Sequence, residues 1–69
     1  MPEEDELAMA ERHVLAARQT VARQRQRLLQ LETIGADTLS ARQTLDVFEA
    51  SLRIFEDHRD YLKHQRDGQ

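Results

Sequence analysis

Apolar side chains recur every seven residues in two segments of the chain. In the first segment the two rows are Leu7, Val14, Val21 and Leu28, and Ala10, Ala17, Gln24 and Leu31; in the second they are Leu45 and Leu52, and Ala41, Phe48, Phe55 and Leu62. Two rows at this spacing are the a and d positions of heptads, which form one apolar stripe along a helix. The pattern predicts two long amphipathic helices.

A short break separates the two segments and contains the internal glycine, Gly35. We expect Gly35 to close the first helix in the left-handed conformation, and Asp37 or Thr38 to accept from the free N–H groups that open the second. Pro2 and the acidic residues after it suit the start of the first helix. The predicted helices span about residues 3–34 and 39–66, with a turn at 35–38. Such a short connection makes them antiparallel neighbours, so the fold class is an all-α helical hairpin, a single domain over residues 1–69.

The register of the hairpin follows from the pairing of side-chain sizes and charges. If residues whose numbers sum to about 72 face each other, small residues oppose large ones in three of the four d layers. The same register places opposite charges on one flank: Glu11–Lys63, Arg18–Glu56, Arg25–Glu49 and Glu32–Arg42. Exposed pairs contribute only about 0.2–1 kcal/mol each. We therefore expect them to fix the register and the antiparallel orientation.

The other flank of the hairpin carries few charges and several apolar residues at heptad spacing. Two helices share one seam and cannot enclose a core, so we predict that this flank joins two hairpins into a homodimeric four-helix bundle, with a tetramer as the larger alternative. The predicted interface consists of Met9, His13, Ala16, Thr20, Val47, Ser51, Ile54, His58 and Tyr61. The competing interpretation is a set of scattered apolar surface residues, which any protein can carry.

A third apolar row lies outside the charged flank and consists of Leu15, Ala22 and Leu29, preceded by Ala8. This row could dock a partner helix or a further copy of the chain. It could equally be ordinary helix-forming sequence. Both interpretations stay open.

The composition limits the classes of protein to which the chain can belong. The chain has 69 residues and no cysteine, which excludes a disulfide scaffold and a cysteine-ligated zinc module and favours a cytoplasmic setting. There is no apolar run of the length that spans a membrane, and the acidic start does not resemble a signal peptide. We therefore expect no membrane association.

Three histidines invite a search for a metal site. His13 and His58 are expected to face each other, but zinc needs three or four ligands and we expect no carboxylate on that flank. No metal or cofactor is predicted, and the two histidines are interpreted as hydrogen-bonding interface residues. A pH-sensitive interface is a second interpretation, because histidine changes charge close to neutral pH. Ser40 and Ser51 have no organised base beside them, and a glycine-rich phosphate loop is absent, so no catalytic residue is predicted.

Charge is distributed unevenly over a net charge of −3. Residues 12–31 carry five arginines and no acidic residue, which raises the question of nucleic-acid binding. Two of these arginines, Arg18 and Arg25, are expected to pair with the second helix. The sequence therefore predicts a small non-enzymatic protein–protein interaction or scaffold protein that self-associates. The alternative is a nucleic-acid-associated protein that uses the arginine-rich first helix.

Several segments together resemble a group of bacterial proteins. They are Glu-Arg-His-Val at 11–14, Ala-Arg-Gln-Thr-Val-Ala-Arg-Gln at 17–24, the Gly-Ala-Asp-Thr turn and the stretch at 48–59 with two phenylalanines. The chain resembles small helical-hairpin proteins without assigned function from alphaproteobacteria such as rhizobia and their relatives. The resemblance covers nearly the whole chain. It implies a cytoplasmic bacterial protein and no particular activity, ligand or catalytic residue.

Overall fold

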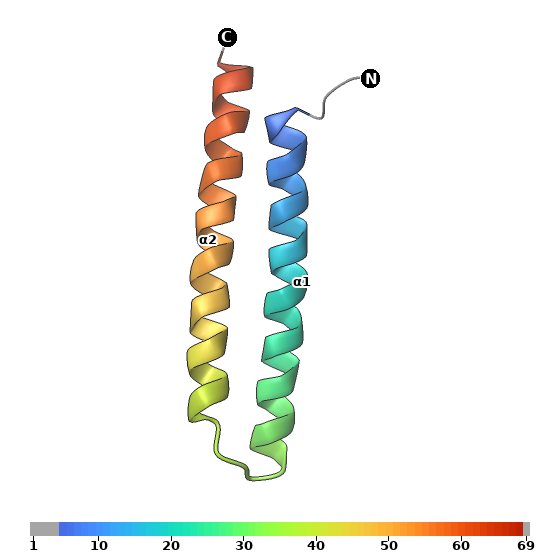
Figure 1. Cartoon of the computed structure of the whole chain (residues 1–69), viewed down its shortest axis with the longest axis vertical. Coiled ribbons are helices and arrows are strands. Elements are labelled where there is room, and N and C mark those ends of the chain that lie inside the picture. The colour runs from blue at the N-terminus through green and yellow to red at the C-terminus, as the bar shows by residue number, and fades with distance from the viewer. Residues whose placement is uncertain (1–4, 69) are drawn as a thin grey trace.

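The computed structural model describes residues 5–68, which form two helices and one connection. Helix α1 spans Glu6–Thr33 and helix α2 spans Leu39–Asp67. The helices run antiparallel side by side in one layer (Figure 1), with overall extents of 53 × 25 × 13 Å. The predicted all-α helical hairpin is therefore confirmed. Neither helix carries a stretch that is both long and apolar enough to cross a membrane, within the part of the chain described.

Helix α1 begins and ends with specific backbone caps. The Asp5 carboxylate accepts a hydrogen bond of 2.8 Å from the Ala8 N–H, which satisfies one of the free donors of the first turn. At the other end Gly35 has a φ of 73°, its N–H donates to the Glu32 carbonyl, and the Ala36 N–H donates to the Leu31 carbonyl. These two bonds are a Schellman motif, as expected for Gly35. The expected contribution of Pro2 to the helix start lies outside the described residues.

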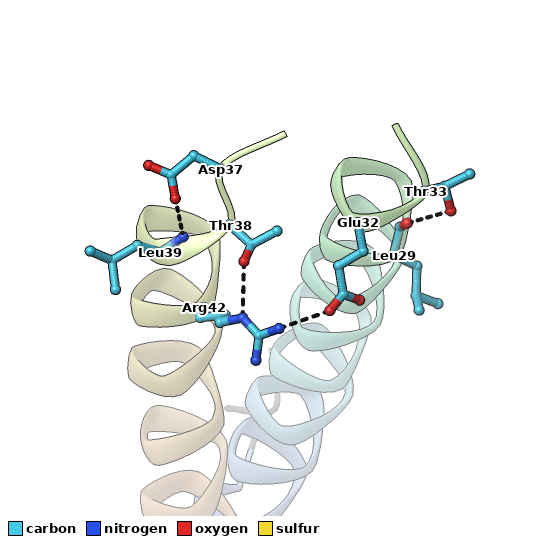
Figure 2. A network of polar contacts seen from close by, with 7 residues as sticks. All are labelled: Leu29, Glu32, Thr33, Asp37, Thr38, Leu39 and Arg42. Atoms are coloured by element: carbon cyan, nitrogen blue, oxygen red, sulfur yellow. Dashed lines mark hydrogen bonds and ion pairs between the residues drawn. The ribbon is translucent and has the colours of Figure 1, made fainter. Parts of the chain in front are cut away.

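Helix α2 begins with an acidic side chain as its cap, and Figure 2 shows the arrangement. The Asp37 carboxylate accepts from the Leu39 N–H at 3.0 Å. Thr38, the other predicted candidate, makes no capping bond; its hydroxyl instead accepts from Arg42 Nε at 3.0 Å. Arg42 in turn contacts Glu32 of α1 at 2.9 Å. The connection between the helices is thus tied to both of them.

The seam between the helices is made by the predicted a and d rows. The most buried side chains among the described residues are Leu7, Ala10, Val14, Val21 and Leu45, all on these rows. Arg59 opposes Val14 on the a rows of the seam. Its side chain is only 23% exposed, and its Nε donates to Asp60 at 2.7 Å. Phe55 departs from the expectation for a d residue, since it is 37% exposed. The open side of its layer is the flank without ion pairs, described below.

Replacement of Gly35 tests the role of the left-handed cap. Gly35→Ala should lower the free energy of unfolding by about 1 kcal/mol, because a Cβ disfavours positive φ. A Cβ there meets no atom within 4 Å, so the loss is conformational and not steric. Urea unfolding followed by circular dichroism measures it. Gly35→Asn is the matched control and should lose less, because asparagine tolerates this conformation; equal losses would contradict the explanation.

Candidate self-association surface

One flank of the hairpin is covered by ion pairs between the helices. Arg18 contacts Glu56 at 3.1 Å and Arg25 contacts Glu49 at 2.7 Å, in addition to the Arg42–Glu32 pair at the turn. Three of the four predicted pairs therefore form among the described residues, and the predicted register is confirmed. We call this side the charged flank.

The fourth predicted pair does not form: among the described residues, no ion pair joins Glu11 to Lys63. The three pairs that form all use arginine, whose planar guanidinium matches a carboxylate. Lysine presents a strongly hydrated point charge on a flexible stem, and fixing it at an exposed position brings little gain. The prediction for this pair was wrong for that reason.

The opposite side carries the residues predicted as an interface, and we call it the open flank. Val47 is 63% exposed, Ile54 67% and Tyr61 59%, which places an apolar row along the outside of α2. Met9, His13, Ala16 and His58 are exposed beside this row, whereas Thr20 and Ser51 are half-buried next to the seam. The nine residues thus form one continuous side of the hairpin.

A groove runs between the helices in the middle of the open flank. It has a volume of about 340 Å³ and is lined by His13, Ala16, Ala17, Thr20, Phe48, Ser51 and Phe55. None of these lining residues is an aspartate, glutamate, lysine or arginine. Sequence reasoning placed Phe48 and Phe55 in the seam and missed that they also form the wall of a groove. The signal was available, because Ala16, Ala17 and Thr20, which oppose them on this side, are small.

His13 and His58 meet at a second, smaller depression of about 210 Å³, together with Glu6, Met9 and Ala10. The presence of Glu6 corrects the expectation that no carboxylate lies on this flank. Glu6 precedes His13 by one heptad, so extending the row by one repeat would have found it. No group of three metal-binding side chains is close enough to hold an ion within residues 5–68. The His13 ring contacts Phe55 at a centroid distance of 5.6 Å.

Two arginines of α1 lie on the open flank. Arg23 Nη2 donates to the Thr20 hydroxyl at 3.3 Å, and that hydroxyl donates to the Ala16 carbonyl. Arg27 lines a depression near the turn with Asp37 and Thr44 but forms no ion pair with the described residues. Among the described residues, the groove in the middle of the open flank is therefore lined by no Asp, Glu, Lys or Arg, whereas Arg23, Arg27 and Asp37 lie on the turn side and Glu6 on the other.

The third apolar row lies beside the charged flank. Leu15 is 58% exposed and Leu29 is 63% exposed, and Ala22 between them is exposed too. The neighbouring row of α2 consists of Asp46, Arg53 and Asp60. This side of the molecule therefore combines two leucines with many charges, unlike the open flank.

The arginine-rich segment of α1 does not form one basic surface. Arg18 and Arg25 are held by Glu56 and Glu49 on the charged flank. Arg23 and Arg27 project on the open flank, because each precedes a seam residue by one position and is turned about 100° from it. The charges are thus distributed around the helix, and two of them are neutralised by α2.

No protein-family model, curated protein or solved structure matches the chain. The resemblance to helical-hairpin proteins of alphaproteobacteria therefore stays a prediction.

A double-mutant cycle measures how much the ion pairs of the charged flank contribute. Arg25→Ala, Glu49→Ala and the double variant should give a coupling free energy of about 0.2–1 kcal/mol, because the pair is exposed to solvent. Thermal unfolding at low and high salt reads it out, and high salt should reduce it. Arg27→Ala is the control, since Arg27 has no such pair. A coupling as large for Arg27 with Glu49 would contradict the assignment.

Proposed function

We propose that the chain is a small non-enzymatic interaction or scaffold protein that associates with a second copy through the open flank, forming a four-helix bundle. The observation that carries this proposal is the exposed row of Val47, Ile54 and Tyr61 beside an apolar groove. On that side the seam is left open, whereas ion pairs cover it on the other side. A second hairpin would close the open seam with the same kind of surface, as an isologous dimer requires.

The exposed area supports the same proposal. The chain exposes 5670 Å², whereas a folded monomer of 8.1 kDa typically exposes about 4,500 Å². A stable interface covers about 800 Å² on each partner. The excess is thus of the size that one interface removes. Residues 5–68 form a single layer of two helices, which leaves two broad faces exposed.

The role of such a dimer is to present helical surface at a fixed spacing. In a bundle formed through the open flank, the charged flank and the row of Leu15, Ala22 and Leu29 remain on the outside. A protein partner would meet that outer surface. We propose a cytoplasmic setting for this role, on the absence of cysteine.

Nucleic-acid binding by α1 remains the alternative prediction. No specific arrangement of the arginines favours it over self-association. A filter-binding titration at low salt would support it if retention fell steeply with added salt.

Replacement of Ile54 tests the proposed interface. Ile54→Glu should raise the dissociation constant of the dimer by about 100-fold, because a charge would be buried without a partner in the bundle. Light scattering over a concentration series measures the mass. Since Ile54 is 67% exposed in the hairpin, the variant should keep its helical circular dichroism spectrum.

The control is Leu15→Glu, which changes a leucine of similar exposure on the other side of the hairpin. It should leave the dimer intact. If Leu15→Glu dissociated the dimer and Ile54→Glu did not, the interface would lie on the side of Leu15 and not on the open flank, which would contradict the proposal. A wild-type protein that stays monomeric at every concentration would contradict self-association itself.

A further inference from the structure

Two residues of opposite charge, Glu6 and Arg27, lie towards the two ends of the open flank. Glu6 and Arg27 are three heptads apart on the same row of α1, about 31 Å along the helix at 1.5 Å per residue. Both are exposed. Arg27 has no ion pair among the described residues, and Glu6 lies at the depression that holds His13 and His58. Within one hairpin these two charges are too far apart to meet.

The midpoint between Glu6 and Arg27 falls at Ala16 and Ala17. These are the smallest side chains of the groove lining, and both belong to the groove in the middle of the open flank. Helices approach most closely where their facing residues are small. The point at which the charges would be symmetric is therefore also the point at which two copies of α1 can pack closest. Charge and shape lead independently to the same position.

Two symmetric arrangements of the hairpins are available to a face-to-face dimer. If the twofold axis runs along the hairpin, the copies are parallel, and α1 lies over α2 of the partner at the same level. Arg27 then opposes the partner's Thr44 and Glu6 opposes the partner's Gln65, and both of these opposing residues are uncharged. If the axis runs across the hairpin at Ala16 and Ala17, the copies are antiparallel and α1 lies over the partner's α1. Glu6 of each copy then opposes the partner's Arg27.

From this geometry we infer that the two hairpins of the dimer run antiparallel and cross at Ala16 and Ala17, with two reciprocal ion pairs between Glu6 and Arg27 of the partner. The inference rests on the self-association proposed above and adds its arrangement and the residues that specify it. Charge pairs at the edge of an interface favour the correct arrangement over others more than they add affinity. The groove of each copy faces the groove of the other, which brings the ring of Phe55, 37% exposed in the hairpin, to the centre of the bundle.

Charge exchange between two variants tests the pairing. Glu6→Arg and Arg27→Glu should each raise the dissociation constant of the homodimer by about tenfold at low ionic strength, because each creates two like-charge contacts. A mixture of the two variants restores both pairs in the heterodimer. Its dissociation constant should return to within about threefold of the wild-type value. Since the two positions are far apart within one hairpin, recovery on mixing can only arise between subunits.

Cysteine cross-linking gives an independent readout, and the chain has no cysteine of its own. Ala16→Cys should form a disulfide-linked dimer under mild oxidation, because the two Cα atoms lie at the axis. Thr44→Cys is the control. Thr44 lies far from the twofold axis and therefore far from Thr44 of the partner subunit. A mixture of Glu6→Cys and Arg27→Cys proteins should form the mixed dimer in preference to either homodimer.

The outcomes separate the arrangement from the association itself. A wild-type dimer whose variants do not recover on mixing, or in which Ala16→Cys does not cross-link, overturns the antiparallel arrangement and leaves self-association standing. In the parallel arrangement Ala16 would lie near Ile54 of the partner subunit. A disulfide between Ala16→Cys of one copy and Ile54→Cys of the other, with no disulfide between two Ala16→Cys residues, would therefore show the parallel arrangement. A wild-type monomer by light scattering would overturn both proposals.

Discussion

The register of α1 against α2 determines which side chains share a face, and every other feature depends on it. Arg18–Glu56, Arg25–Glu49 and Glu32–Arg42 fix this register at three levels along the hairpin. Each pair is exposed and contributes little free energy by itself. Their joint effect is geometric, because a shift of α2 by one residue would turn its rows by about 100° and break all three contacts. The ion pairs thus select one packing of a seam that is otherwise only apolar.

This register also distinguishes the two faces as surfaces for a second copy. On the charged flank, an antiparallel dimer centred on Ala22 would bring Arg18 over the partner's Arg25 and Glu56 over the partner's Glu49. A parallel dimer there would place Leu15 and Leu29 against a charged row of α2. Either choice opposes like charges or buries charge against leucine. The open flank avoids both costs, because its charges are few and complementary. The asymmetry between the flanks therefore favours the open flank as the surface for the self-association proposed above.

The heptad rows and the single internal glycine were sufficient to predict two helices, their connection and their register. The predictions hold where one interaction dominates, as at Gly35, where a left-handed cap has few alternatives. They fail where several weak interactions compete. Lys63 was expected to pair with Glu11 on the pattern alone, but its flexibility decides the outcome, and the choice of Asp37 over Thr38 as cap depends on Arg42 occupying the threonine hydroxyl.

The candidate surface was less predictable than the fold. Its apolar row of Val47, Ile54 and Tyr61 follows from heptad spacing, but the groove does not. A groove depends on the difference in size between residues on neighbouring rows, here Ala16 and Thr20 against Phe48 and Phe55. Glu6 was missed because it stands at the start of a helix, where acidic residues are expected for the dipole alone. A residue can serve both a helix end and an interface, and sequence reasoning assigned it only the first role.

The small size of the seam connects stability to association. The buried side chains of the described residues are few and all aliphatic, and α2 contributes only Leu45 to them. In the proposed dimer, a hairpin with so little buried area would gain a large fraction of its stability from the copy that covers its open flank. Binding that favours the folded chain raises its stability by mass action. In that dimer, Ile54→Glu would weaken association and would thereby also lower the free energy of unfolding, although the helices themselves stay formed. Exchange of charge at Glu6 and Arg27 would act on stability only through this linkage, because it alters the contact between copies and leaves the seam within each copy untouched.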